Sequence, residues 1–198
     1  MLFSAPASAQ ALRIVAFGDS LIAGFGLRAN EAFPAQLENA LKKRGHDVAI
    51  VNAGVSGDTT SGGLARLDWS VPDGTEALIL VLGANDMLRG MEPELARKNL
   101  DEMIGRLKAR KIEVLLAGMR AAPNMGADYA AKFDSIYASL AKQHDILIYP
   151  FFLDGVAGER EMNLNDGIHP TPKGVSLIVE RIMPMVESLI ERVKKRRG

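Results

Sequence analysis

A serine, an aspartate and a histidine in this chain have the residue types and the order of a nucleophilic hydrolase. Ser20 lies in a Gly-Asp-Ser-Leu stretch directly after an apolar run, and Asp166 and His169 lie three residues apart far downstream. A histidine can take the proton of a serine hydroxyl while a carboxylate holds the imidazole in the required tautomer. Because the chain contains three histidines and no cysteine, few other side chains could serve as a base near neutral pH.

The segment around His169 favours such a pairing. Residues 165–174 contain two prolines, which stiffen the loop, and side chains three positions apart can point to the same side. Asp166 is therefore expected to accept the Nδ1 proton of His169, so that Nε2 turns towards a hydroxyl. The other two histidines, His46 and His144, follow turn-forming or polar residues and are expected at the surface.

Two further positions are candidates for stabilising an oxyanion, which needs preorganised hydrogen-bond donors. Gly54 follows the second apolar run and offers a backbone N–H that a substrate can approach closely, and Asn85 follows the third run and offers a neutral amide. The alternatives are structural, because Asn-Asp pairs are common in turns and Ser20 is also a good helix cap. Ser56, in the same block as Gly54, is a weaker candidate nucleophile.

The elements that would position these residues alternate between strands and helices. Short runs rich in Val, Ile and Leu are typical of strands buried on both faces, and they predict strands over residues 12–17, 47–52, 77–82, 113–117 and 146–149. Amphipathic spacing and Pro or Gly boundaries predict helices over residues 35–44, 91–110, 129–143 and 174–195. A kink is expected in the last of these at Pro184.

This alternation predicts a parallel sheet with helices on both faces. In such sheets ligands bind beyond the carboxyl ends of the strands. Ser20, Gly54 and Asn85 each follow a predicted strand, and Asp166 and His169 lie in the segment after the fifth. The five residues are therefore expected at one edge of the sheet.

The length of 198 residues favours a single domain over residues 11–198, with residues 1–10 outside the fold as a disordered or residual signal-peptide segment. The 24 basic and 24 acidic side chains cancel, which gives no electrostatic reason to bind nucleic acid or a membrane surface. The basic residues 192–197 are interpreted as the solvated last turn of a helix. No run reaches transmembrane length, so no stable membrane insertion is expected.

The stretch Ala-Ser-Ala at residues 7–9 fits the small-x-small pattern before a signal-peptidase cleavage point. It favours a periplasmic or secreted protein. A plain terminus and a cytoplasmic location are the alternatives.

Four ordered blocks resemble the SGNH (GDSL) hydrolases, namely residues 18–21, 52–59, 83–86 and 166–170. The resemblance covers the chain from about residue 12 and is greatest to the bacterial periplasmic thioesterase I, protease I and lysophospholipase L1 branch with its arylesterase relatives. It implies a three-layer α/β/α, flavodoxin-like fold with a five-stranded parallel sheet, and it implies neither a metal nor an organic cofactor.

The resemblance also implies roles for individual residues. Ser20 would be the nucleophile, His169 the base and Asp166 its orienting acid. The oxyanion donors would be the N–H groups of Ser20 and Gly54 and the side chain of Asn85. The expected activity is hydrolysis of acyl esters, including aryl esters, lysophospholipids and acyl-CoA thioesters, by a monomer or small homo-oligomer.

Apolar residues near the expected edge suit an acyl chain, because Met and Leu fill irregular space. The candidate substrate contacts are Asp19, Leu21, Met87, Leu88, Pro123, Phe152 and Ile168. A carbohydrate acetyl-esterase with the same catalytic set is the alternative enzyme, but Trp69 is the single tryptophan available as a sugar platform. A nucleotide-binding domain is a further alternative, although the G-x-G-x-x-A pattern at residues 24–29 does not lie directly at a strand-to-helix turn.

Overall fold

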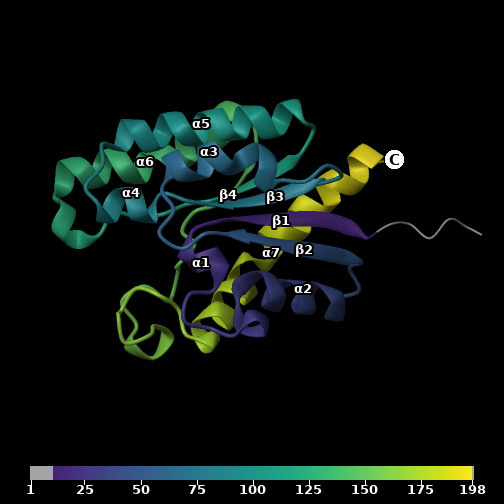
Figure 1. The fold of residues 1–198 in the computed structure, drawn as a ribbon, viewed down its shortest axis with the longest axis horizontal. Helices are drawn as coiled ribbons and strands as arrows, with labels where there is room; N and C mark the ends of the chain where they lie inside the picture. Colours follow the sequence, from purple (N-terminus) through teal and green to yellow (C-terminus); the bar gives the residue numbers. More distant parts are fainter. Residues whose placement is uncertain (1–10, 198) are drawn as a thin grey trace, which may run out of the picture.

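The computed structural model describes residues 11–197, and its centre is one parallel β-sheet (Figure 1). The strand order is β2-β1-β3-β4-β5, which is the flavodoxin-like order. The strands are β1 (Leu12–Gly18), β2 (Val48–Gly54), β3 (Ala77–Val81), β4 (Glu113–Ala117) and β5 (Leu147–Tyr149). All five residues of the central β3 are buried, as the continuous apolar run predicts.

Helices cover both faces of the sheet and complete three layers (Figure 1). One face is covered by α2 (Phe33–Lys43) and α7 (Pro172–Arg197), and the other by α3 (Thr60–Ser70), α5 (Pro93–Ala109) and α6 (Ala127–His144). Short helices complete the chain: α1 (Ser20–Ala23), α4 (Ala84–Leu88), and the 3-10 turns η1 (Ala29–Glu31), η2 (Pro123–Met125) and η3 (Arg160–Met162). The predicted fold class is confirmed.

The predicted and observed elements differ at α3, which was not among the predicted helix ranges, and at the ends of the other long helices. The α-helix α7 (Pro172–Arg197) contains Pro184 and extends two residues beyond the predicted range 174–195 at each end. The kink expected at Pro184 stays a prediction. The basic residues at its end are not simply solvated, because Arg197 pairs with Glu76 and Arg196 pairs with Glu113. These ion pairs tie the last turn of α7 to the sheet.

The predicted signal-like segment, residues 1–10, lies outside the described residues. The periplasmic or secreted location therefore stays a prediction. Within residues 11–197, no helix is long and apolar enough to cross a membrane.

Candidate active site

Three side chains from distant parts of the chain are linked by hydrogen bonds at the carboxyl edge of the sheet. Nε2 of His169 lies 2.9 Å from Oγ of Ser20, and its Nδ1 lies 2.7 Å from Oδ2 of Asp166. With the Nδ1 proton donated to the carboxylate, Nε2 is left as the acceptor of the serine hydroxyl proton. This is the geometry that a serine nucleophile and its base require.

Asp166 also organises the loop that carries the imidazole. Its Oδ1 accepts the backbone N–H groups of Ile168 and His169, both at 3.0 Å. These two hydrogen bonds, together with the one from the His169 side chain, lower the pKa of Asp166 from 3.8 to about 2. The acid therefore stays ionised and available to His169 throughout the neutral range.

Ser20 is the first residue of α1, directly after β1 and its neighbour Asp19. Asp19 is the N-cap of that helix, and its Oδ1 accepts the N–H of Leu21 at 3.0 Å. The N–H of Ser20 itself has no hydrogen-bond partner among residues 11–197. A donor of this kind beside the candidate nucleophile would be available to a developing oxyanion.

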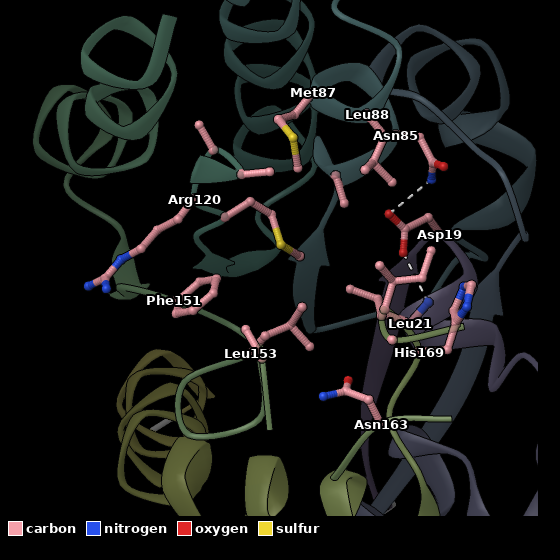
Figure 2. A pocket seen from close by; sticks show the side chains of 18 of the residues that line it. Asp19, Leu21, Asn85, Met87, Leu88, Arg120, Phe151, Leu153, Asn163 and His169 are labelled. Carbon is pink, nitrogen blue, oxygen red and sulfur yellow. Dashed lines mark hydrogen bonds between the residues drawn. The ribbon is translucent and has the colours of Figure 1, made fainter. Parts of the chain in front are cut away.

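Asp19 is fully buried, with 0% of its surface exposed. Its Oδ2 lies 3.3 Å from Nδ2 of Asn85, which also donates to the backbone O of Asp58 at 2.9 Å (Figure 2). Burial raises the pKa of Asp19 from 3.8 to about 7, against the lowering effects of the Leu21 N–H and of His169. The structure thus brings Asn85 to the site, with a buried carboxyl group beside it.

Gly54 requires a correction, because its N–H does not face an open site. It donates to Oδ1 of Asn52 at 3.0 Å. A Cβ at Gly54 would lie 2.1 Å from the backbone N of Ala23, so the glycine permits close packing of β2 against α1. In the loop that follows β2, Gly57 has φ +81° and an N–H without a partner among residues 11–197.

Arg66 of α3 is a positioning residue that the sequence did not single out. It is 6% exposed and donates to Oδ2 of Asp58 at 2.7 Å and to the backbone O atoms of Gly18 and Ala53 at 2.8 and 2.9 Å. Its guanidinium also lies 4.0 Å from the centre of the Phe17 ring. One cation therefore joins the ends of β1 and β2 to the loop that Asn85 contacts.

Asp86 has a structural role beside Asn85. Its Oδ2 accepts the N–H of Thr60 at 2.9 Å, and its Oδ1 accepts the Thr60 hydroxyl at 2.6 Å. The amide of Asn99 donates to the same hydroxyl at 3.0 Å. These bonds connect α4 to the first turn of α3 and hold Asn85 at the edge of the sheet.

A cavity of about 470 Å³ opens beside Ser20, His169 and Asn85. Figure 2 shows Met87, Phe151 and Leu153 among the side chains around it, with Arg120 on its far side from His169. Most of its wall is apolar, and six of the seven expected substrate contacts lie on it: Asp19, Leu21, Met87, Leu88, Pro123 and Ile168. Such a wall suits an apolar group better than a sugar.

Phe152, the seventh expected contact, is instead part of the core. It is fully buried and packs edge-to-face on Phe33, with ring centres 5.1 Å apart. Its neighbour Phe151 lines the cavity and lies beneath the guanidinium of Arg120, at 4.9 Å. Consecutive residues of the loop after β5 therefore face opposite ways.

The remaining histidines contact carboxylates elsewhere in the molecule. His46 is 3.3 Å from a carboxylate oxygen of Glu187, and His144 lies 2.5 Å from one of Asp101. Neither residue lines the cavity beside Ser20.

Comparison with known proteins relates this geometry to a family. Residues 16–177 match the model of the GDSL-like Lipase/Acylhydrolase family. The chain is 38% identical over 191 residues to Esterase TesA of Pseudomonas aeruginosa, covering 96% of this chain and 94% of that protein. It is 38% identical to an arylesterase of Vibrio mimicus, covering 91% of each.

More distant similarity extends to an Escherichia coli protein named thioesterase 1/protease 1/lysophospholipase L1, at 34% identity over 92% of this chain and 87% of that protein. Among solved structures, AlinE4, described as an SGNH-hydrolase family esterase, superposes with a TM-score of 0.78 at 45% identity. That superposition covers 92% of this chain and 98% of the other.

Proposed function

Since the chain belongs to the GDSL-like lipase/acylhydrolase family and is a carboxylic ester hydrolase, we propose that it acts through an acyl-enzyme on Ser20. The observation that carries this proposal is the continuous link from Ser20 Oγ through His169 to Asp166, at 2.9 and 2.7 Å. Among residues 11–197, no other serine is hydrogen-bonded to a histidine side chain.

In the first step His169 takes the Ser20 proton as Oγ attacks the carbonyl carbon. The oxyanion receives hydrogen bonds from the N–H groups of Ser20 and Gly57, both unpartnered among residues 11–197. Asn85 contributes its amide by giving up the longer hydrogen bond, 3.3 Å, to Asp19. Gly57 takes the place that Gly54 was expected to fill.

The intermediate then collapses. The bond from the carbonyl carbon to the leaving oxygen or sulfur breaks, and His169 returns its proton to that atom. A water molecule next attacks the acyl-enzyme with His169 again as base. The carboxylic acid leaves and the Ser20 hydroxyl is restored.

The acyl group occupies the apolar cavity in this proposal. Its wall includes the flexible apolar side chains of Met87, Leu88 and Met119. Such side chains can pack against acyl groups of several shapes. Aryl esters, lysophospholipids and acyl thioesters are therefore the proposed substrate classes, as the names of the relatives also suggest. Carbohydrate acetyl-esterase activity has less support, because Trp69 is 76% exposed on α3 and does not line the cavity.

Replacing the nucleophile tests the proposal directly. We expect Ser20→Ala to lower hydrolysis of p-nitrophenyl esters by roughly 10⁴-fold or more without unfolding the protein. A phosphonate that reacts with activated serines should modify Ser20 in the unchanged protein. The matched control is Ser56→Ala, which should keep activity and labelling. Full activity of Ser20→Ala, or an adduct on Ser56, would contradict the mechanism.

A further inference from the structure

An aromatic side chain lies against the proposed base from outside the cavity. The ring centres of Phe25 and His169 are 4.4 Å apart, with the planes tilted by 33°. Phe25 is 49% exposed, and it does not line the cavity beside Ser20. The imidazole therefore borders both the proposed acyl cavity and an open aromatic surface.

The loop after α1 holds Phe25 in this position. Gly24 and Gly26, on either side, have φ +82° and +74°, a conformation that favours glycine. The N–H of Phe25 donates to the backbone O of Ser20 at 3.1 Å. Its placement is therefore coupled to the turn that presents the nucleophile.

The reaction places the leaving group close to His169. When the intermediate collapses, the leaving oxygen must lie within roughly 3 Å of Nε2 to receive its proton. Because the Phe25 ring lies against the same imidazole, a flat group bonded to that oxygen can reach its exposed surface. The acyl chain, on the other bond of the carbonyl carbon, extends into the cavity.

We propose that Phe25 forms a leaving-group subsite that favours esters of aromatic alcohols. This inference rests on the proposed function, because it needs an acyl-enzyme on Ser20 with His169 as proton donor. An aromatic pair is more stable than two apolar groups that bury the same area. Where only one of two substrates can form the pair, this difference corresponds to roughly 3- to 10-fold in rate.

A purely structural role would give a different result. If Phe25 only held the His169 ring in place, its loss would slow every substrate alike, because His169 serves all of them. Ratios between substrates that share an acyl group separate the two roles.

The same subsite must also receive an alcohol that attacks the acyl-enzyme, because acyl transfer retraces the path of the leaving group.

The test compares the unchanged protein with Phe25→Leu, Phe25→Tyr and Trp69→Leu. Phenyl acetate and hexafluoroisopropyl acetate supply an aryl and an alkyl leaving group of similar acidity. Acetyl transfer to benzyl alcohol and to cyclohexylmethanol compares acceptors of similar size. Trp69→Leu is the matched control, since it removes an exposed ring that does not line the cavity.

We expect Phe25→Leu to lower the aryl-to-alkyl ratio of kcat/KM, and the benzyl-to-cyclohexylmethyl transfer ratio, by roughly 3- to 10-fold. Phe25→Tyr keeps an aromatic ring and should therefore show the same two ratios as the unchanged protein. Trp69→Leu should change neither ratio. Unchanged ratios in Phe25→Leu would overturn the subsite while the proposed function stands. Failure to detect acetylated Ser20 in the unchanged protein would overturn both.

Discussion

Asp166 performs two tasks with its two oxygen atoms. Oδ2 accepts the imidazole proton of His169, and Oδ1 accepts the N–H groups of Ile168 and His169. The backbone bonds are the largest cause of its low pKa, about 2. The same carboxylate therefore organises the loop and holds the proposed base, His169, and a substitution can separate the two tasks.

Asp166→Asn keeps an oxygen for the backbone N–H groups but presents an amide to Nδ1 of His169. The favoured tautomer then carries its proton on Nε2, where it cannot accept the Ser20 proton. We expect kcat to fall by roughly 10²- to 10⁴-fold. The upper figure is that of a buried triad acid, and a smaller loss is included because the Asp166 side chain is 36% exposed. Steady-state kinetics and thermal unfolding would measure this, with Asp154→Asn as the control. A loss below tenfold would show that the carboxylate is dispensable.

Residue types and order were sufficient to predict that Ser20, Asp166, His169 and Asn85 lie together at one edge of the sheet. They were not sufficient for Gly54 and Phe152, because the end of a strand indicates the edge of the sheet but not the direction of an N–H or a ring. The Gly54 N–H is turned to Asn52, and neighbouring Phe151 and Phe152 face opposite ways. Loop residues have no periodicity that would separate such neighbours.

At the scale of elements, α3 holds the site through a single buried cation. Arg66 joins β1, β2 and the loop at Asp58, and the Asp58 carbonyl accepts a hydrogen bond from Asn85. The side chains of Arg66 and Asp58 are 7% and 10% exposed. Removing one partner of such a pair leaves a buried charge without compensation.

We expect Arg66→Met to lower the free energy of unfolding by about 3–5 kcal/mol, because the Asp58 carboxylate and two strand-end carbonyls lose their donor. Urea unfolding measures this change. The control is Arg106→Met, whose exposed partners Asp68 and Glu102 make a loss of at most about 1 kcal/mol expected. Equal losses in the two variants would show that the buried Arg66–Asp58 pair contributes no more to stability than the exposed pairs of Arg106.

The sequence predicted the strands and four of the five helices longer than ten residues. The exception is α3, which has 11 residues like α2 but was not among the predicted helix ranges; the shortest helices were not predicted either. Continuous apolar runs indicated the strands, and amphipathic spacing indicated α2, α5, α6 and α7. The helices α1 and α4 contain four and five residues, too few for a periodic pattern to show. Local hydrogen bonds stabilise them instead. Asp19 caps the N-terminus of α1, and Asp86 of α4 accepts two hydrogen bonds from Thr60.

At the scale of the whole molecule, the strand order assembles the site. Because β1 lies between β2 and β3, Ser20, the loop at Gly57 and Asn85 meet at one edge. His169 comes from the segment before α7 and meets Ser20 across 149 positions of sequence. This convergence also buries the Asp19 carboxyl group completely, which has a consequence for stability.

The native pKa of Asp19, about 7, exceeds its ordinary value of 3.8 because burial penalises the charged form. The groups around it have opposing effects, since His169 lowers the pKa and Asp58 raises it. Between about pH 4 and 7 the native protein keeps a proton that the unfolded chain has lost. Raising the pH through this window therefore lowers the free energy of unfolding. Above and below the window, the contribution of Asp19 to that free energy does not change with pH.

Asp19→Asn removes this titration while keeping an oxygen for the N–H of Leu21. We expect the unfolding free energy of the unchanged protein to fall relative to that of Asp19→Asn between pH 4 and 8. The full change is on the order of 4 kcal/mol. Urea unfolding of both proteins at pH 4.5, 6 and 8 gives this difference, in which titrations common to the two cancel. A difference that stays constant over the range would mean that Asp19 is ionised in the folded protein throughout, and that its burial does not hold the proton.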